Sequence, residues 1–166
     1  MMKGTTSTDV GYSGEVRIYL KSNDNMKEVY VHNEGKKALW NLLARAVAGY
    51  DVKNLLPRYL DLVNETSGLS MLYKRIPFTG IIWGDSVEKD ETGTSTLFNA
   101  TLTSEYKTKS ISNSKIELRM LNSNNDVLAS VSGGTGILDV YNSVVPGVDA
   151  VIEWKLTFKN YTTDKE

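Results

Sequence analysis

The clearest pattern in the chain is Ala150-Val151-Ile152-Glu153-Trp154-Lys155-Leu156-Thr157-Phe158. Apolar residues occupy every second position of this segment, and mostly polar or charged residues alternate with them. Successive side chains of a β-strand point to opposite faces of the sheet, so the spacing predicts a strand with one buried face. These apolar side chains are large, Trp154 above all, which indicates a strand at the centre of the sheet.

Strict alternation also marks the N-terminal part of the chain. Val16, Ile18 and Leu20 alternate with polar residues between Glu15 and Lys21, and Val29 and Val31 do so between residues 26 and 32. The turn-forming residues 22–25 separate the two segments. The sequence therefore predicts a β-hairpin here.

Seven further segments have strand character, and turn-forming residues separate nearly every pair. Pro57 and Pro77 are expected where strands begin, because a missing amide hydrogen costs little there. The predicted strands are Pro57–Val63, Leu69–Ile76, Phe78–Trp83, Thr96–Thr103, Lys115–Leu121, Val127–Ser132 and Ile137–Tyr141.

One amphipathic helix is predicted at about residues 34–48. Asn33 is a suitable N-terminal cap, and Gly49 can adopt the left-handed conformation that ends a helix. The apolar residues between them recur at helical spacing and should cover an edge or open end of the β core. They are Leu39, Leu42, Leu43, Ala46 and Val47, with Trp40 alongside.

These elements predict a mainly β protein, an antiparallel β-sandwich that is jelly-roll-like. The expected organisation is a flexible N-terminal arm at 1–14, a single β-sandwich domain at 15–160 and a polar C-terminal tail at 161–166. The composition, 40% hydrophobic and 23% charged, is that of an ordinary globular domain.

Charge and composition exclude several classes of function. The net charge of −1, with no basic arm, argues against binding to nucleic acid. There is no cysteine for a disulfide, a thiolate nucleophile or a zinc site. The N-terminus lacks the apolar run of a signal peptide, and no segment is apolar enough to span a membrane, so we expect synthesis in the cytoplasm.

Few residues in the sequence are of the kinds that commonly carry out catalysis. His32, the only histidine, is expected to close a turn rather than act as a base. The glycine-rich residues 133–136 lack the Lys-Ser/Thr of a phosphate loop. We therefore expect no enzymatic activity and no cofactor.

One acidic cluster, Asp85 to Glu91, is expected to be a solvated loop. A carboxylate pair for glycoside hydrolysis and a calcium site are the alternatives, with Asp85, Glu88 and Asp90 as weak candidate metal ligands.

Nine tyrosines suggest binding surfaces rather than chemistry. Tyrosine rings serve protein interfaces and also stack on sugars. The candidate interface residues are Tyr19, Tyr30, Tyr106 and Tyr161.

Two motifs resemble structural proteins of bacteriophage particles. They are His32-Asn33-Glu34-Gly35, which leads into Leu39-Trp40-Asn41-Leu42-Leu43, and the closing segment Glu153-Trp154-Lys155-Leu156-Thr157-Phe158-Lys159-Asn160. The resemblance implies a decoration, capsid or tail-associated protein that forms homo-oligomers, binds other virion structural proteins and resides in the virion. The alternative is a carbohydrate- or receptor-binding module, possibly assisted by calcium.

Overall fold

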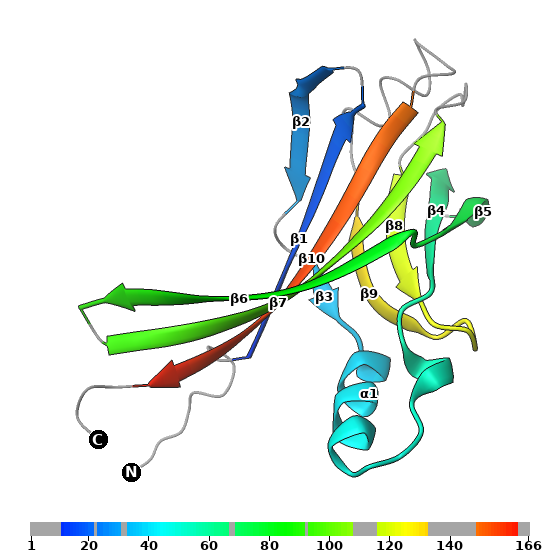
Figure 1. Ribbon diagram of the computed structural model, residues 1–166. Helices are drawn as coiled ribbons and strands as arrows, with labels where there is room; N and C mark the ends of the chain where they lie inside the picture. Colours follow the sequence, from blue (N-terminus) through cyan, green and yellow to red (C-terminus); the bar gives the residue numbers. More distant parts are fainter. Residues whose placement is uncertain are drawn as a thin grey trace.

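The protein consists of two antiparallel β-sheets that pack face to face, with one helix at an end of the sandwich (Figure 1). This computed structural model describes residues 11–21, 23–30, 33–66, 69–91, 93–107, 116–132 and 149–162. The first sheet has the strand order β2-β1-β10-β7-β6, and the second has the order β3-β9-β8-β4-β5. The predicted fold class, a mainly β antiparallel sandwich with one helix, is confirmed.

The elements alternate between the two sheets along the chain. In the first sheet they are β1 Gly11–Leu20, β2 Asn23–Tyr30, β6 Gly80–Asp90, β7 Gly93–Lys107 and β10 Asp149–Thr162. In the second they are β3 Glu34–Gly35, β4 Tyr59–Thr66, β5 Leu69–Pro77, β8 Ile116–Leu121 and β9 Val127–Ser132. The helix α1 is Lys37–Val47, and a 3-10 turn, η2, is Lys53–Leu55.

Strand β10 lies at the centre of the first sheet, as its alternation predicts. Trp154 pairs with Val16 of β1 on one side and with Leu102 of β7 on the other. All three side chains are buried, and they face Leu60, Leu118, Met120 and Leu128 of the second sheet. The predicted hairpin of β1 and β2 is also confirmed.

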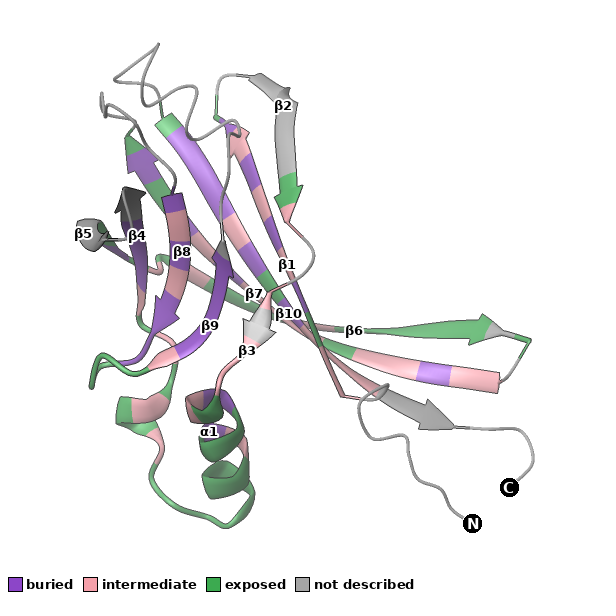
Figure 2. Ribbon diagram, turned by 180° about the vertical axis from the view of Figure 1, so that it is seen from behind, coloured by how far each residue is buried: buried purple, intermediate pink, exposed green. Residues whose placement is uncertain are grey.

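The first sheet extends beyond the second. β6, β7 and the end of β10 continue past the sandwich as a projection, near the start of β1 (Figure 1). We call this projection the arm and define it as residues 84–90, 93–99 and 157–162, which lie beyond the paired residues Trp83, Ala100 and Leu156. Figure 2 shows mainly exposed and intermediate residues along β6 and the arm part of β7, against the buried stripes of the sandwich.

Several expectations at strand boundaries need correction. Residues 11–14, expected in a flexible arm, pair with β10 as part of β1. Pro77 ends β5 rather than beginning a strand. The jelly roll is not confirmed, because β1–β2, β4–β5, β6–β7 and β8–β9 each pair within one sheet. The predicted strand at 137–141, residues 1–10 and residues 163–166 lie outside the described residues.

Helix α1 ends as predicted but begins later. Its N-cap residue is Lys36, which makes no side-chain cap hydrogen bond, so Asn33 is not the cap. At the other end Gly49 has a φ of +84°, and the amides of Gly49 and Tyr50 donate to the carbonyls of Ala46 and Arg45. This pair of bonds is a Schellman motif.

The apolar stripe of α1 is only partly covered. Leu39 and Leu42 are buried against the sandwich, whereas Val47 is 91% exposed. The helix therefore closes the end of the core with its first two turns. Its last turn presents apolar side chains to the surroundings.

Candidate interaction surface

The acidic cluster lies in a strand rather than in a loop. Asp85, Glu88 and Asp90 belong to β6, where Asp85 and Glu88 point to opposite faces of the sheet, and Lys159 Nζ lies 3.2 Å from Glu88 Oε1. Within the described residues, no three His, Cys, Asp or Glu side chains are grouped in a way that could hold a metal ion. His32 and residues 133–136 lie outside the described part of the chain.

Among the described residues, hollows occur at two places on the body. One, of about 240 Å³, lies on the outer face of the first sheet and is lined by Glu15, Arg17, Thr101, Glu153 and Lys155. Its charges alternate in sign, and Arg17 forms an ion pair with Glu15 at 3.3 Å. This arrangement is typical of the solvated face of a sheet. The other is wide and borders the start of α1, lined in part by Lys36, Lys37 and Asn41.

Exposed apolar side chains lie on the core-side face of β6 and β7, on the arm and on the residues just before it. Asp85 of β6 is exposed on this face between Trp83 and Val87. Trp83 is 69% exposed and Phe98 of β7 is 40% exposed, and Ile81 and Val87 of β6 lie on the same face. We call these four residues the apolar ledge. They continue the core face of the sheet, because their register positions follow Leu102 and Trp154 outward along the strands.

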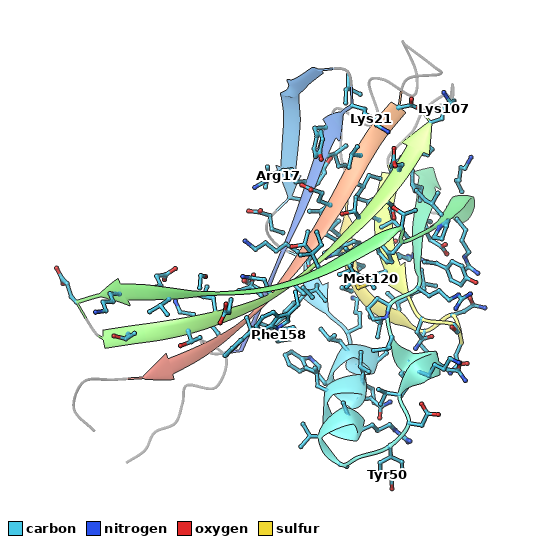
Figure 3. The ribbon with its side chains drawn as sticks, in the orientation of Figure 1. Arg17, Lys21, Tyr50, Lys107, Met120 and Phe158 are labelled. Atoms are coloured by element: carbon cyan, nitrogen blue, oxygen red, sulfur yellow. The ribbon has the colours of Figure 1, made fainter. Side chains whose placement is uncertain are left out.

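The ledge is joined to the body by three packed aromatic rings. Tyr12 of β1 lies 5.7 Å from Phe158 of β10 and 5.9 Å from Trp40 of α1, centroid to centroid. Phe158 pairs directly with Phe98 of the ledge and lies at the root of the arm (Figure 3). The aromatic surface therefore runs from the start of α1 onto the arm.

Burial affects the chemistry of this junction. The Tyr12 hydroxyl donates a 2.6 Å hydrogen bond to Asn33 Oδ1, and burial raises the pKa of Tyr12 to about 12. Gly14 makes room for this contact, since a Cβ at that position would lie 2.0 Å from Asn33 Oδ1. Asn33 thus fastens β1 at the junction instead of capping the helix.

The outer face of the arm is mainly polar. Ser86 and Glu88 of β6 lie on this face, as do Thr157 and Lys159 of β10. Thr157 Oγ1 bonds Asn99 Oδ1 at 2.9 Å, and Lys159 pairs with Glu88. The inner face of the arm is mixed, because the exposed Asp85 and Lys89 of β6 lie on it beside Val87 and Phe98.

The tyrosines singled out from the sequence contribute little to this surface. Tyr106 was expected at an exposed interface, but its side chain is buried in the core, because it points toward the second sheet. Tyr19 and Tyr30 are half-buried, and the side chain of Tyr161 lies outside the described part of the structure.

The sequence analysis does not identify Trp83 and Phe98 as surface residues. The signal in the sequence for an exposed apolar face is the triplet Ile81-Ile82-Trp83, which places apolar side chains on both faces of one strand. That pattern does not show that β6 lies at an edge, a fact set by long-range pairing.

Comparison with models of known families, with curated proteins and with solved structures found no match. No helix among the described residues is long and apolar enough to cross a membrane.

Proposed function

We propose that this chain is a non-enzymatic structural component of a bacteriophage particle that acts through contacts between its own copies and with other virion proteins. The observation that carries the proposal is the apolar ledge. It lies partly on the arm and partly just before it, and none of the described residues of the same chain covers it.

The exposed ledge is unfavourable for a chain that works alone. An aromatic side chain buries about 150–250 Å² when covered, at roughly 25 cal/mol per Å² of apolar surface. Large contiguous apolar patches are therefore typical of surfaces that bind a partner. The arm also projects from the body, so a partner can reach its inner face (Figure 1).

The bacteriophage part of the proposal is supported by the resemblance of the two motifs. These motifs supply Trp40 and Phe158, two of the three rings that join the ledge to the body. The segments that resemble virion proteins thus contribute to the junction beside the ledge, although none of the four ledge residues belongs to them. An assembly protein would use them to hold the arm at a fixed angle to the sandwich.

The size of the purified protein and its presence in particles test the proposal together. Mass photometry should show oligomers, and mass spectrometry of purified phage particles from the host that carries the gene should detect the chain. A protein that stays monomeric and is missing from the particles would overturn the proposal.

A carbohydrate-binding module is the second candidate, and the exposure of Trp83 favours it specifically. An exposed indole can stack on the apolar face of a sugar ring. A glycan array probed with the protein and with Trp83→Ala tests this function. Binding that is lost in the variant would support it, and no binding to any glycan would remove it.

A further inference from the structure

Among the described strands, β6 has the least protected edge. β6 is the last strand of the first sheet, and no other described strand pairs with its outer edge (Figure 1). It has 11 residues, contains no proline and pairs with β7 without a register shift. An edge of this kind exposes a row of backbone amide and carbonyl groups, to which another strand can be added.

The other three edge strands carry features that hinder further pairing. β3 has only 2 residues. β2 and β5 both pair with their neighbours through a register shift, and β5 also ends at Pro77. Short length, bulges and prolines are common means by which proteins block the edges of their sheets. The long, regular edge of β6 therefore stands apart from the other three.

The odd-numbered residues of β6 direct their backbone groups to the free edge. Asp90 pairs with Gly93 across a connection of two residues, and the pair that closes such a connection exchanges backbone hydrogen bonds. These bonds alternate along an antiparallel pair of strands, so the even-numbered residues of β6 bond β7. The amide and carbonyl groups of Asp85, Val87 and Lys89 therefore point away from β7, and their side chains share the core-side face.

The charged side chains on this face limit which strand can be added. Asp85 and Lys89 are both exposed, and neither forms an ion pair in the described part of the chain. Opposite charges directly across an antiparallel pair stabilise it, and like charges destabilise it. A second copy of β6, antiparallel to the first and centred on Val87, meets this requirement. Asp85 of each copy then lies opposite Lys89 of the other.

Other symmetric registers of two β6 strands are less favourable. A centre at Asp85 or at Glu88 would place two carboxylates directly opposite each other, and a centre at Ser86 would leave Asp85 opposite Val87. In the register centred on Val87, this residue meets its own copy, and Ser86 lies opposite Glu88. The carboxylate of Glu88 is already paired with Lys159 of its own chain. The charges of β6 therefore select one register.

We propose that the outer edge of β6 binds the same edge of a second copy, antiparallel about a two-fold axis at Val87. The free backbone groups of Asp85, Val87 and Lys89 then bond those of Lys89, Val87 and Asp85 of the other copy, and the two first sheets become one continuous sheet. Because the same surface of both copies meets, the contact is isologous and closes as a dimer. This inference rests on the proposed assembly function and specifies its interface.

A cysteine on the two-fold axis tests the contact directly. The chain has no cysteine, so a single-cysteine variant can form a covalent dimer only at the introduced site. Val87→Cys should give a disulfide-linked dimer under mild oxidation, because directly paired Cα atoms lie about 5.5 Å apart, within the range that a disulfide spans. Ile82→Cys is the matched control, since Ile82 is 67% exposed and Val87 64%. In the proposed register the two copies of Ile82 lie about 33 Å apart along the strands.

Exchange of charges tests the register. Asp85→Lys and Lys89→Asp each place like charges opposite one another at both ends of the contact, so sedimentation velocity should show a dissociation constant raised about tenfold or more. An equimolar mixture of the two variants should form heterodimers, and the double variant should associate like the wild type, because both restore opposite charges. Lys53→Asp makes the same change of charge at an exposed site on the body and should leave association unchanged. Circular dichroism checks that each variant is folded.

The outcomes separate this inference from the proposed function. If the wild-type protein assembles but Val87→Cys forms no more covalent dimer than Ile82→Cys, the copies meet elsewhere, and this inference fails while the assembly function stands. Charge variants that associate as well as the wild type would overturn it in the same way. A monomeric wild-type protein would remove this inference, and its absence from particles as well would remove the proposed function.

Discussion

At the scale of single residues, Trp154 contributes most to the core. Its side chain is fully buried at the centre of the first sheet, and its Nε1 atom has no hydrogen-bond partner among the described residues. Trp154→Ala should lower the free energy of unfolding by about 3–5 kcal/mol, because it leaves a large cavity. Trp154→Phe should cost less, since it also removes the unpaired N–H group. Urea unfolding measures the stability of both variants. A loss of less than about 1 kcal/mol in Trp154→Ala would contradict the prediction.

The buried carboxylate of Asp61 has Arg75 as its partner among the described residues. Arg75 donates to it in bidentate fashion, Nε to Oδ1 at 2.7 Å and Nη2 to Oδ2 at 2.9 Å, and the guanidinium lies 5.1 Å from the ring centroid of Tyr59. Arg75→Ala should destabilise the protein by about 2–3 kcal/mol by leaving the carboxylate unpaired. In chemical denaturation, Asp61→Asn combined with Arg75→Ala should recover part of this loss. A double variant less stable than Arg75→Ala would refute the explanation.

Tyr12 should make stability depend on alkaline pH. Its pKa is raised to about 12 by burial, above the ordinary value of 10, so the unfolded chain loses the proton first. The contribution of the neutral hydroxyl is therefore full below pH 10 and is lost as the pH rises through 12. Between pH 9 and pH 12, the free energy of unfolding should fall less steeply for Tyr12→Phe than for the wild type. Parallel curves would show that Tyr12 does not cause the loss.

At the scale of elements, local patterns predicted some boundaries and missed others. β9 has the predicted bounds, and β10 has the predicted inward face, because alternation records a face covered by the opposite sheet. The end of β6 lacks that signal, since Asp85 to Asp90 are held by pairing with β7 rather than by burial. The acidic cluster therefore resembled a solvated loop in sequence and is a strand in the structure.

The end of helix α1 at Gly49 was predicted correctly from the sequence, and its stability can be tested by substitution. Gly49 has a φ of +84° in the Schellman motif, a conformation that a side chain disfavours. Gly49→Ala should destabilise the protein by about 1 kcal/mol, and Gly49→Asn by less, because asparagine tolerates this conformation better. Thermal unfolding checks the order of the three proteins. Gly84→Ala serves as the control, since a Cβ there meets nothing within 4 Å.

At the scale of the whole molecule, the arm arises because the two sheets differ in length. The strands of the first sheet reach up to 15 residues, in β7, whereas β8 and β9 of the second have 6 each. Local alternation cannot reveal this mismatch, because it shows that a strand has two faces and not which parts of a face are covered. Trp83 and Phe98 lie on the uncovered part of an otherwise buried face, which explains why the sequence left the candidate site unrecognised.

The arm and the body should therefore separate into an assembly unit and a folding unit. A shortened chain in which an Asn-Gly turn joins Trp83 directly to Ala100 keeps their paired positions and the whole sandwich core. Urea unfolding should remain cooperative, with a loss on the order of 1–2 kcal/mol, because the deleted residues fill no part of the core between the sheets. Mass photometry should show monomers, since the shortened chain keeps Ile81 and Trp83 but lacks Val87 and Phe98, half of the ledge. A shortened chain that still assembles would place the interface on the body, and one that fails to fold would show that the arm supports the sandwich.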